Sequence, residues 1–130
     1  MDAAIVTVGD EILSGDIANS NAKWLSGQLT DRGVNVERIL TLPDRSSLIT
    51  EYVREWSTQF DVVIVTGGLG GTHDDVTLDA VADAFDRELV VDDEIRTTVV
   101  DKVAAHRDLD PTEVAMGNVG IDIDAWSTVP

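Results

Sequence analysis

The segment DVVIVTGGLGGTHDDVT, residues 61–77, joins a strand to a helix through a glycine-rich loop. Four consecutive apolar residues predict a buried strand over 61–66, and the spacing of apolar residues predicts a helix over 77–85. The loop contains four glycines within residues 67–71. A simple strand-to-helix turn, the alternative, needs fewer glycines. The pattern therefore favours a loop whose backbone approaches a ligand closely.

The chemistry of this loop favours a phosphorylated ligand. Backbone N–H groups of a glycine-rich loop can converge on phosphate oxygens, and the N-terminus of the following helix adds positive potential. The spacing differs from the dinucleotide pattern G-x-G-x-x-G, and no Lys-Ser or Lys-Thr pair follows as in a P-loop. The residues predicted to bind a small phosphorylated, nucleotide-like ligand are Thr66, Gly67, Gly68, Leu69, Gly70 and Thr72.

Two adjacent carboxylates, Asp74 and Asp75, follow the loop. One of them is expected to cap the helix that begins near Val76. A carboxylate beside a phosphate-binding loop also repels the ligand unless it holds a divalent cation. Magnesium held by one or two carboxylates and the phosphates of a substrate is a common arrangement. The role of Asp75 can therefore be either that of a helix cap or that of a cation ligand.

Strands and helices alternate along the chain around this loop. We predict strands over 3–8, 34–40, 61–66 and 88–91. We predict helices over 19–31, from an N-cap at Ser46 or Ser47 to Trp56, over 77–85, after an N-cap at Asp92, and from Pro111. This alternation indicates an α/β fold with a mostly parallel sheet that is covered by helices on both faces. Ligands of such sheets bind beyond the carboxyl ends of the strands. The loops over 9–15, 41–45 and 66–75 are therefore expected to meet at one site.

The first of these loops carries two adjacent carboxylates, Asp10 and Glu11. They suit a metal ion, or hydrogen bonds from a sugar or pterin, although a solvated acidic loop is the alternative. The polar residues 19–21, at the start of the next helix, are predicted to be helix caps rather than ligand contacts. The large side chains predicted to lie in the core include Trp24, Trp56 and Phe85.

The composition limits the kinds of protein this can be. The 130 residues suit one domain over 1–130, and the absence of cysteine excludes disulfides, thiolate metal sites and cysteine nucleophiles. No apolar run approaches the roughly 20 residues that span a bilayer. The first strand begins without a basic region or a signal-peptide pattern. We expect a cytoplasmic protein.

The charge of the chain is strongly negative. Twenty-five acidic residues against nine basic ones give a formal net charge of −16. Such a surface repels nucleic acids and anionic membranes, so neither is expected as a partner. Acidic, lysine-poor surfaces resemble those of proteins from salt-loving organisms, in which ions screen the repulsion. An acidic surface that binds a basic partner is the alternative.

This interpretation predicts that the fold loosens at low ionic strength. Screening by salt weakens the repulsion among the 25 acidic side chains, so the melting temperature is expected to rise with KCl concentration. A thermal melt at a series of KCl concentrations measures this. A melting temperature that is indifferent to KCl would count against the salt-adapted interpretation.

Three motifs together resemble the molybdopterin-binding (MoCF) domain family, and within it the N-terminal domain of CinA-like proteins. They are VGDEILSG at residues 8–15, NSN at 19–21, and TGGLG with THDDVT across 66–77. Their order and spacing match the family, and the resemblance covers roughly residues 3–105. It implies a three-layer α/β/α sandwich, and it implies assembly into a homo-oligomer such as a trimer or dimer.

The resemblance also implies a function and a set of site residues. CinA-like members are associated with metal-dependent hydrolysis of ADP-ribose-like pyrophosphates, and adenylyltransferase members use the glycine loop in molybdenum cofactor biosynthesis. It implies catalytic and metal-binding roles for Asp44 and Asp75, with Mg²⁺ or another divalent cation. Molybdopterin is a possible ligand, and Asp10, Glu11 and Ser14 are further implied contacts.

Two departures from the family pattern leave alternatives open. Gly71 stands where the family has proline, which loosens the loop. The family also continues into further loops, so the C-terminal part of the family domain is expected to be missing from this chain. A molybdopterin- or nucleotide-binding module without turnover is therefore the alternative to a pyrophosphatase.

Overall fold

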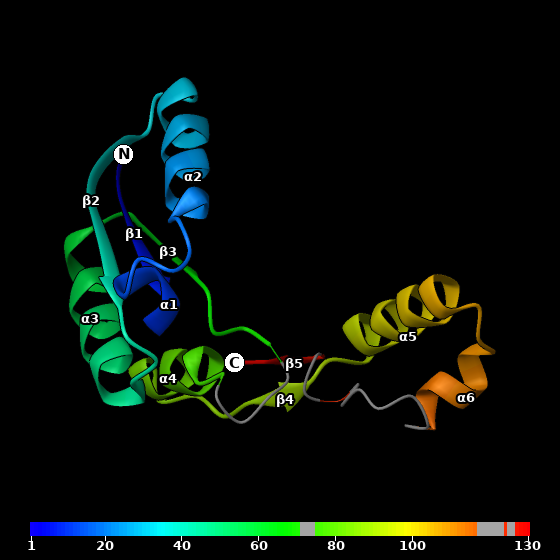
Figure 1. Ribbon diagram of the computed structural model, residues 1–130. Helices are drawn as coiled ribbons and strands as arrows, with labels where there is room; N and C mark the ends of the chain where they lie inside the picture. Colours follow the sequence, from blue (N-terminus) through cyan, green and yellow to red (C-terminus); the bar gives the residue numbers. More distant parts are fainter. Residues whose placement is uncertain (71–74, 117–123, 125–126) are drawn as a thin grey trace.

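The computed structural model describes residues 1–70, 75–116, 124 and 127–130. Its centre is a parallel sheet of three strands, β1 (Asp2–Val8), β2 (Asn35–Leu42) and β3 (Val62–Thr66), in the order β2-β1-β3 (Figure 1). The central strand β1 is buried on both faces because it is apolar at nearly every position. The strands predicted around residues 3–8, 34–40 and 61–66 are thereby confirmed.

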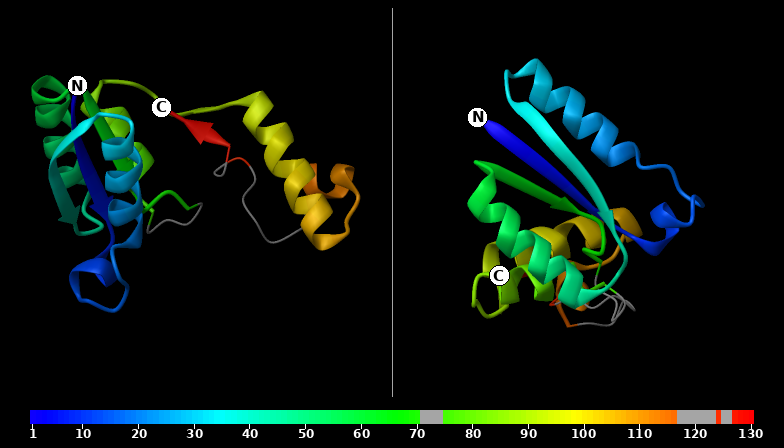
Figure 2. Two further views of the ribbon diagram at one scale, coloured as in Figure 1. Left: turned by 90° about the horizontal axis from the view of Figure 1, so that it is seen from above. Right: turned by 90° about the vertical axis from the view of Figure 1, so that its left-hand side faces the viewer.

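Helices cover both faces of this sheet. Helix α2 (Ser20–Asp31) lies on one face, and α3 (Ser46–Gln59) and α4 (Thr77–Ala84) lie on the other (Figure 2). The result is the predicted three-layer α/β arrangement with a parallel sheet. None of the helices in the part of the chain that the structure describes is long and apolar enough to cross a bilayer.

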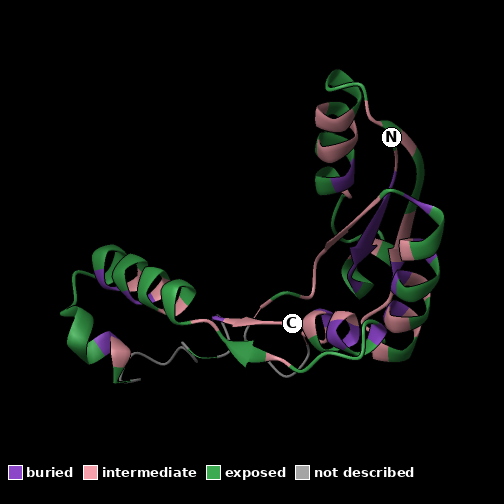
Figure 3. Cartoon of the chain, turned by 180° about the vertical axis from the view of Figure 1, so that it is seen from behind, coloured by how far each residue is buried: buried purple, intermediate pink, exposed green. Residues whose placement is uncertain are grey.

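The main core lies between the sheet and the layer formed by α3 and α4, where Figure 3 shows most of the buried residues. Tyr52, Trp56 and Phe60 form a chain of edge-to-face contacts, with centroid distances of 5.8 and 5.7 Å. Arg54 donates from its guanidinium to the carbonyl oxygens of Asp83 and Ala84, which satisfies the C-terminal end of α4. The side chains that form this core are Ala4, Val6, Val8, Leu42, Ile49, Val53, Trp56, Phe60, Ala80 and Ala84.

The chain after α4 extends away from the sheet (Figure 1). Its elements are β4 (Val90–Val91), α5 (Asp93–Arg107), α6 (Pro111–Ala115) and β5 (Thr128–Val129), and β4 pairs with β5 in antiparallel fashion. Asp92 caps α5 by accepting a hydrogen bond from the Ile95 N–H at 2.8 Å, as predicted. A small second core of Val100, Ala104 and Val114 joins α5 to α6.

Two aromatic residues predicted to be buried are exposed. Trp24 is 64% exposed, because it lies about 200° around α2 from the buried Ala22 at 100° per residue. Phe85 is 48% exposed, because α4 ends at Ala84 and the apolar stripe ends with it. Trp56 is only 5% exposed, as predicted.

Two local predictions also differ from the structure. The loop over 9–15 contains a four-residue helix, α1 (Asp10–Leu13), which is too short to show a helical period in the sequence. Neither Ser46 nor Ser47 caps α3, because the helix already includes both, and the preceding Arg45 makes no side-chain cap hydrogen bond.

Candidate functional site

The carboxyl ends of the three parallel strands bring the three predicted loops together. The Gly9 N–H donates to the carbonyl oxygen of Leu42 at 2.9 Å, which ties the ends of β1 and β2 together. The Asp10 N–H donates to Asp44 Oδ2 at 3.2 Å, and the Asp44 N–H donates to Asp10 Oδ1 at 3.1 Å. Each carboxylate is thus held in place by the backbone of the other loop.

The glycine loop has a conformation that only glycine adopts easily. Gly67 has φ +87° and Gly68 has φ +59°, in the region where a Cβ is disfavoured. A Cβ at Gly67 would also overlap the carbonyl oxygen of Val8. The first two glycines are therefore required by the close approach of the loop to the end of β1 and to Thr77. The predicted close approach of the loop to a ligand stays a prediction.

Thr77, the last residue of the THDDVT motif, anchors the far end of this loop, a role that the motif alone does not reveal. Its side chain is completely buried, its Oγ1 donates to the Gly67 carbonyl oxygen at 2.7 Å, and its N–H donates to the Gly68 carbonyl oxygen at 3.2 Å. The start of α4 is thereby fixed against the loop. A threonine directly after a valine looks like an ordinary helix residue in the sequence, so only the fold reveals this role.

Two of the predicted carboxylates face the glycine loop. The Cβ position of Gly68 lies 3.5 Å from Asp44 Oδ1, and that of Gly70 lies 2.5 Å from Asp75 Oδ2. The N-cap of α4 is Val76, without a side-chain cap hydrogen bond, so Asp75 is not the capping residue. Asp74 and Thr72 lie outside the described residues.

The two carboxylates that face the glycine loop suit a cation whose other ligands come from the phosphates of a bound molecule. The described residues contain no cluster of three or more His, Cys, Asp or Glu side chains that could hold a metal ion. Magnesium commonly takes one or two carboxylates and completes its shell with water and substrate phosphates. Asp44, in the loop after β2, and Asp75, at the end of the glycine loop, are carboxylates that fit that chemistry. The exposed Ser14 hydroxyl, in contrast, is used within its own turn, donating to Asp16 Oδ2 at 2.8 Å.

A cavity of about 160 Å³ lies beside the start of the glycine loop. It is lined by Val8, Glu11, Ile12, Ile17, Ala18, Asn19, Ser20, Asn21, Thr66 and Gly67. Asn19 precedes α2 but does not cap it with its side chain, contrary to the prediction. Its Nδ2 instead donates to Thr7 Oγ1 at 3.2 Å and to Thr41 Oγ1 at 3.3 Å.

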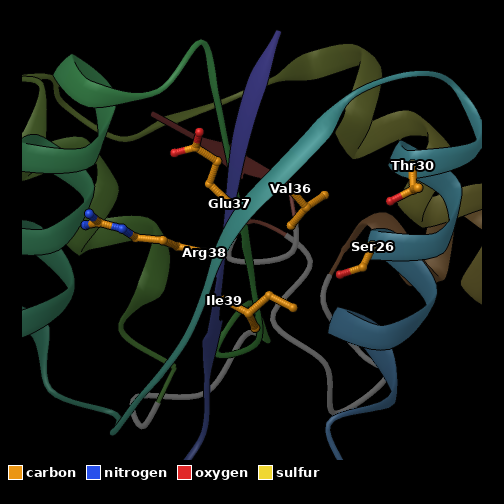
Figure 4. A pocket seen from close by; sticks show the side chains of 6 residues that line it. All are labelled: Ser26, Thr30, Val36, Glu37, Arg38 and Ile39. Atoms are coloured by element: carbon orange, nitrogen blue, oxygen red, sulfur yellow. The ribbon is translucent and has the colours of Figure 1, made fainter.

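A second cavity, of about 440 Å³, lies between α2 and the edge strand β2 (Figure 4). Ser26 and Thr30 of α2 face Val36 and Ile39 of β2, whereas Glu37 and Arg38 point to the other side of the strand (Figure 4). None of the residues that line it belongs to the three loops. This cavity is therefore separate from the site at the strand ends.

Comparison with known proteins agrees with this geometry. A family model described as a probable molybdopterin binding domain matches residues 4–122. The chain belongs to this family. Among solved structures of similar proteins, the protein CinA from Thermoplasma acidophilum superposes with a TM-score of 0.75 at 29% identity, covering 99% of this chain and 70% of that one. MoaB from Thermus thermophilus, a molybdopterin biosynthesis enzyme, has a TM-score of 0.61 at 21% identity over 76% of this chain and 62% of its own, which shows a shared fold alone.

Curated relatives of this molybdopterin-binding-family domain include longer proteins. A protein of Archaeoglobus fulgidus is 50% identical over 95 residues, covering 73% of this chain and 42% of that protein. A CinA-like protein of Thermotoga neapolitana is 39% identical over 112 residues, covering 86% of this chain and 28% of that protein. The chain thus spans less than half of the length of either relative.

Proposed function

We propose that this domain binds a phosphorylated nucleotide on its glycine loop and hydrolyses the pyrophosphate bond of an ADP-ribose-like substrate with the help of a divalent cation. The observation that carries the proposal is the position of Asp44 and Asp75, whose carboxylates both face the loop. CinA-like proteins among the relatives support it.

The loop and the carboxylates have complementary roles in this proposal. Loop N–H groups donate to phosphate oxygens, and Asp44 and Asp75 hold the cation that neutralises the phosphate charge when bound. A water molecule, activated at the carboxylates, attacks one phosphorus while the bridging oxygen leaves. The products are AMP and ribose 5-phosphate, and the proton of the water passes to solvent through a carboxylate.

Binding without turnover is the second candidate. The description of the family model favours a molybdopterin ligand, as in molybdenum cofactor biosynthesis. The described residues also provide two carboxylates at the loop rather than a cluster of three ligands. In this case the loop and a cation would hold the ligand, and no product would form.

The first test combines thermal shift with product analysis in high KCl. ADP-ribose, ATP and molybdopterin are added separately, each with and without Mg²⁺. We expect ADP-ribose with Mg²⁺ to stabilise the fold by about 2.7 kcal/mol at a concentration of about 100 times Kd, and AMP to be released. Stabilisation by molybdopterin or ATP without product would favour the binding module. No shift with any ligand would refute both candidates for this chain.

A further inference from the structure

We infer that the cavity beside the glycine loop is a subsite for the neutral, hydrogen-bond-donating part of the ligand, and that Asn19 is the residue that recognises it. The chemical class is a sugar hydroxyl or an amino group on a ring. The inference rests on the proposed function, because the phosphates of the same ligand are placed on the glycine loop.

The first observation is that the side-chain oxygen of Asn19 accepts no hydrogen bond from the described residues. Both hydrogens of the Asn19 amide are used, because Nδ2 donates to Thr7 Oγ1 and Thr41 Oγ1. The two threonine hydroxyls are themselves joined at 2.8 Å, so the amide is fixed from two sides. Asn19 Oδ1 is buried and has no hydrogen-bond partner among the described residues. Buried polar atoms in folded proteins are nearly always paired, so this oxygen needs a donor that the described residues do not supply.

The second observation is that Asn19 lines a cavity in which a donor group of a ligand can lie. Asn19 lines the 160 Å³ cavity, which is far larger than the space a single water requires. Thr66 and Gly67 line the same cavity, and Gly67 is also the first glycine of the loop. A ligand that has its phosphates on the loop therefore reaches the cavity without leaving the protein surface.

The third observation is the chemistry of the cavity wall. Glu11 adds a second acceptor, and Ile12, Ile17 and Ala18 add apolar surface. Acceptors and apolar groups disfavour phosphate but suit a sugar or a flat ring that carries donors. The site is thus divided into a loop that donates to an anion and a cavity that accepts from a neutral group.

The deciding experiment compares two ligands by calorimetry in high KCl without Mg²⁺, so that the proposed hydrolysis does not consume ADP-ribose. Pyrophosphate occupies only the loop, whereas ADP-ribose also reaches the cavity. We expect Asn19→Ala to weaken ADP-ribose binding about tenfold, the loss expected when a buried hydrogen bond is removed, and to change pyrophosphate binding less than about twofold.

Ser26→Ala is the matched control. Ser26 lies on α2, and its Oγ is also buried without a partner among the described residues, but it lines the separate cavity next to β2. This variant is expected to leave the affinities for both ligands unchanged. If Asn19→Ala weakens both ligands equally, or neither, the inference is overturned while the proposed function stands. If the unmodified chain binds neither ligand, the proposed function itself fails.

A measurement on the unmodified chain covers the case in which Asn19→Ala does not fold. The side-chain amide resonances of Asn19 in a ¹⁵N-labelled sample are expected to shift with ADP-ribose and to stay in place with pyrophosphate. Equal shifts with both ligands would overturn the inference.

Binding of three further ligands identifies the chemical group that donates to Asn19. A loss in Asn19→Ala that is seen with AMP but not with inosine monophosphate would assign the donor to the ring amino group. A loss that is also seen with ribose 5-phosphate would assign it to a sugar hydroxyl. If Asn19→Ala binds all three as the unmodified chain does, the inference fails.

Discussion

Replacing Asp75 with asparagine is expected to lower the turnover of ADP-ribose by about 100-fold or more while the affinity for ADP-ribose is kept. The carboxylate faces Gly70 in the loop, and Val76 rather than Asp75 occupies the N-cap of α4. Asn19 and the glycines, which are proposed to bind the ligand, are unchanged. Asparagine has the shape of aspartate but lacks the charge that holds a cation. Without Mg²⁺, binding should be equal or tighter, because one charge that repels the phosphates is gone.

Asp79→Asn is the control for this variant. Asp79 is exposed in the first turn of the same helix, so the substitution changes the net charge equally without touching the loop. The rate of AMP release and the dissociation constant of ADP-ribose are measured for both variants in high KCl. An equal loss of turnover in Asp79→Asn would indicate a general effect of charge. If Asp75→Asn loses binding together with its melting temperature, Asp75 stabilises the fold and is not a catalytic residue.

The parts of the fold that the sequence predicted are those governed by local chemistry. The strand over 61–66 was visible as an apolar run, although β3 lies at the edge of the sheet and is half-buried rather than buried. Asp92 and Pro111 marked the starts of α5 and α6. Burial along a helix was harder to predict, as Trp24 shows. The spacing of apolar residues in α2 predicts a helix, but α2 buries only Ala22 completely. Which side of a helix meets the sheet depends on the packing of distant segments.

The candidate site likewise contains features that the sequence predicted and features that only the fold reveals. The glycine loop was recognisable because a run of glycines between a strand and a helix indicates a backbone that turns sharply and approaches other groups closely. Asn19 and Thr77 stood in the family motifs, but their roles were not recognisable because their partners lie elsewhere in the chain. Asn19 bonds to Thr41, 22 residues later, and Thr77 bonds to Gly67, 10 residues earlier. Polar residues at the start of a helix are usually caps, and only the assembled strand ends give these two another role.

Replacing Gly67 with alanine is expected to reduce the free energy of unfolding by about 2–4 kcal/mol and to abolish ADP-ribose binding. One part of the loss is the backbone angle, since φ +87° is unfavourable for any residue with a Cβ. The other part is steric, because the new Cβ would overlap the carbonyl oxygen of Val8, in the central strand. The loop has to move, and the hydrogen bond from Thr77 to the Gly67 carbonyl oxygen moves with it.

Gly27→Ala is the matched control, and it is expected to raise the free energy of unfolding rather than lower it. Gly27 lies inside α2 with no atom within 4 Å of its Cβ position. Alanine there is expected to stabilise the fold by about 0.5–1 kcal/mol through its higher helix propensity. Urea denaturation at fixed KCl gives both values, and calorimetry gives the affinities. If Gly67→Ala loses stability but still binds ADP-ribose, the ligand does not use the loop. Unchanged stability would mean that the loop does not adopt the conformation on which the site depends.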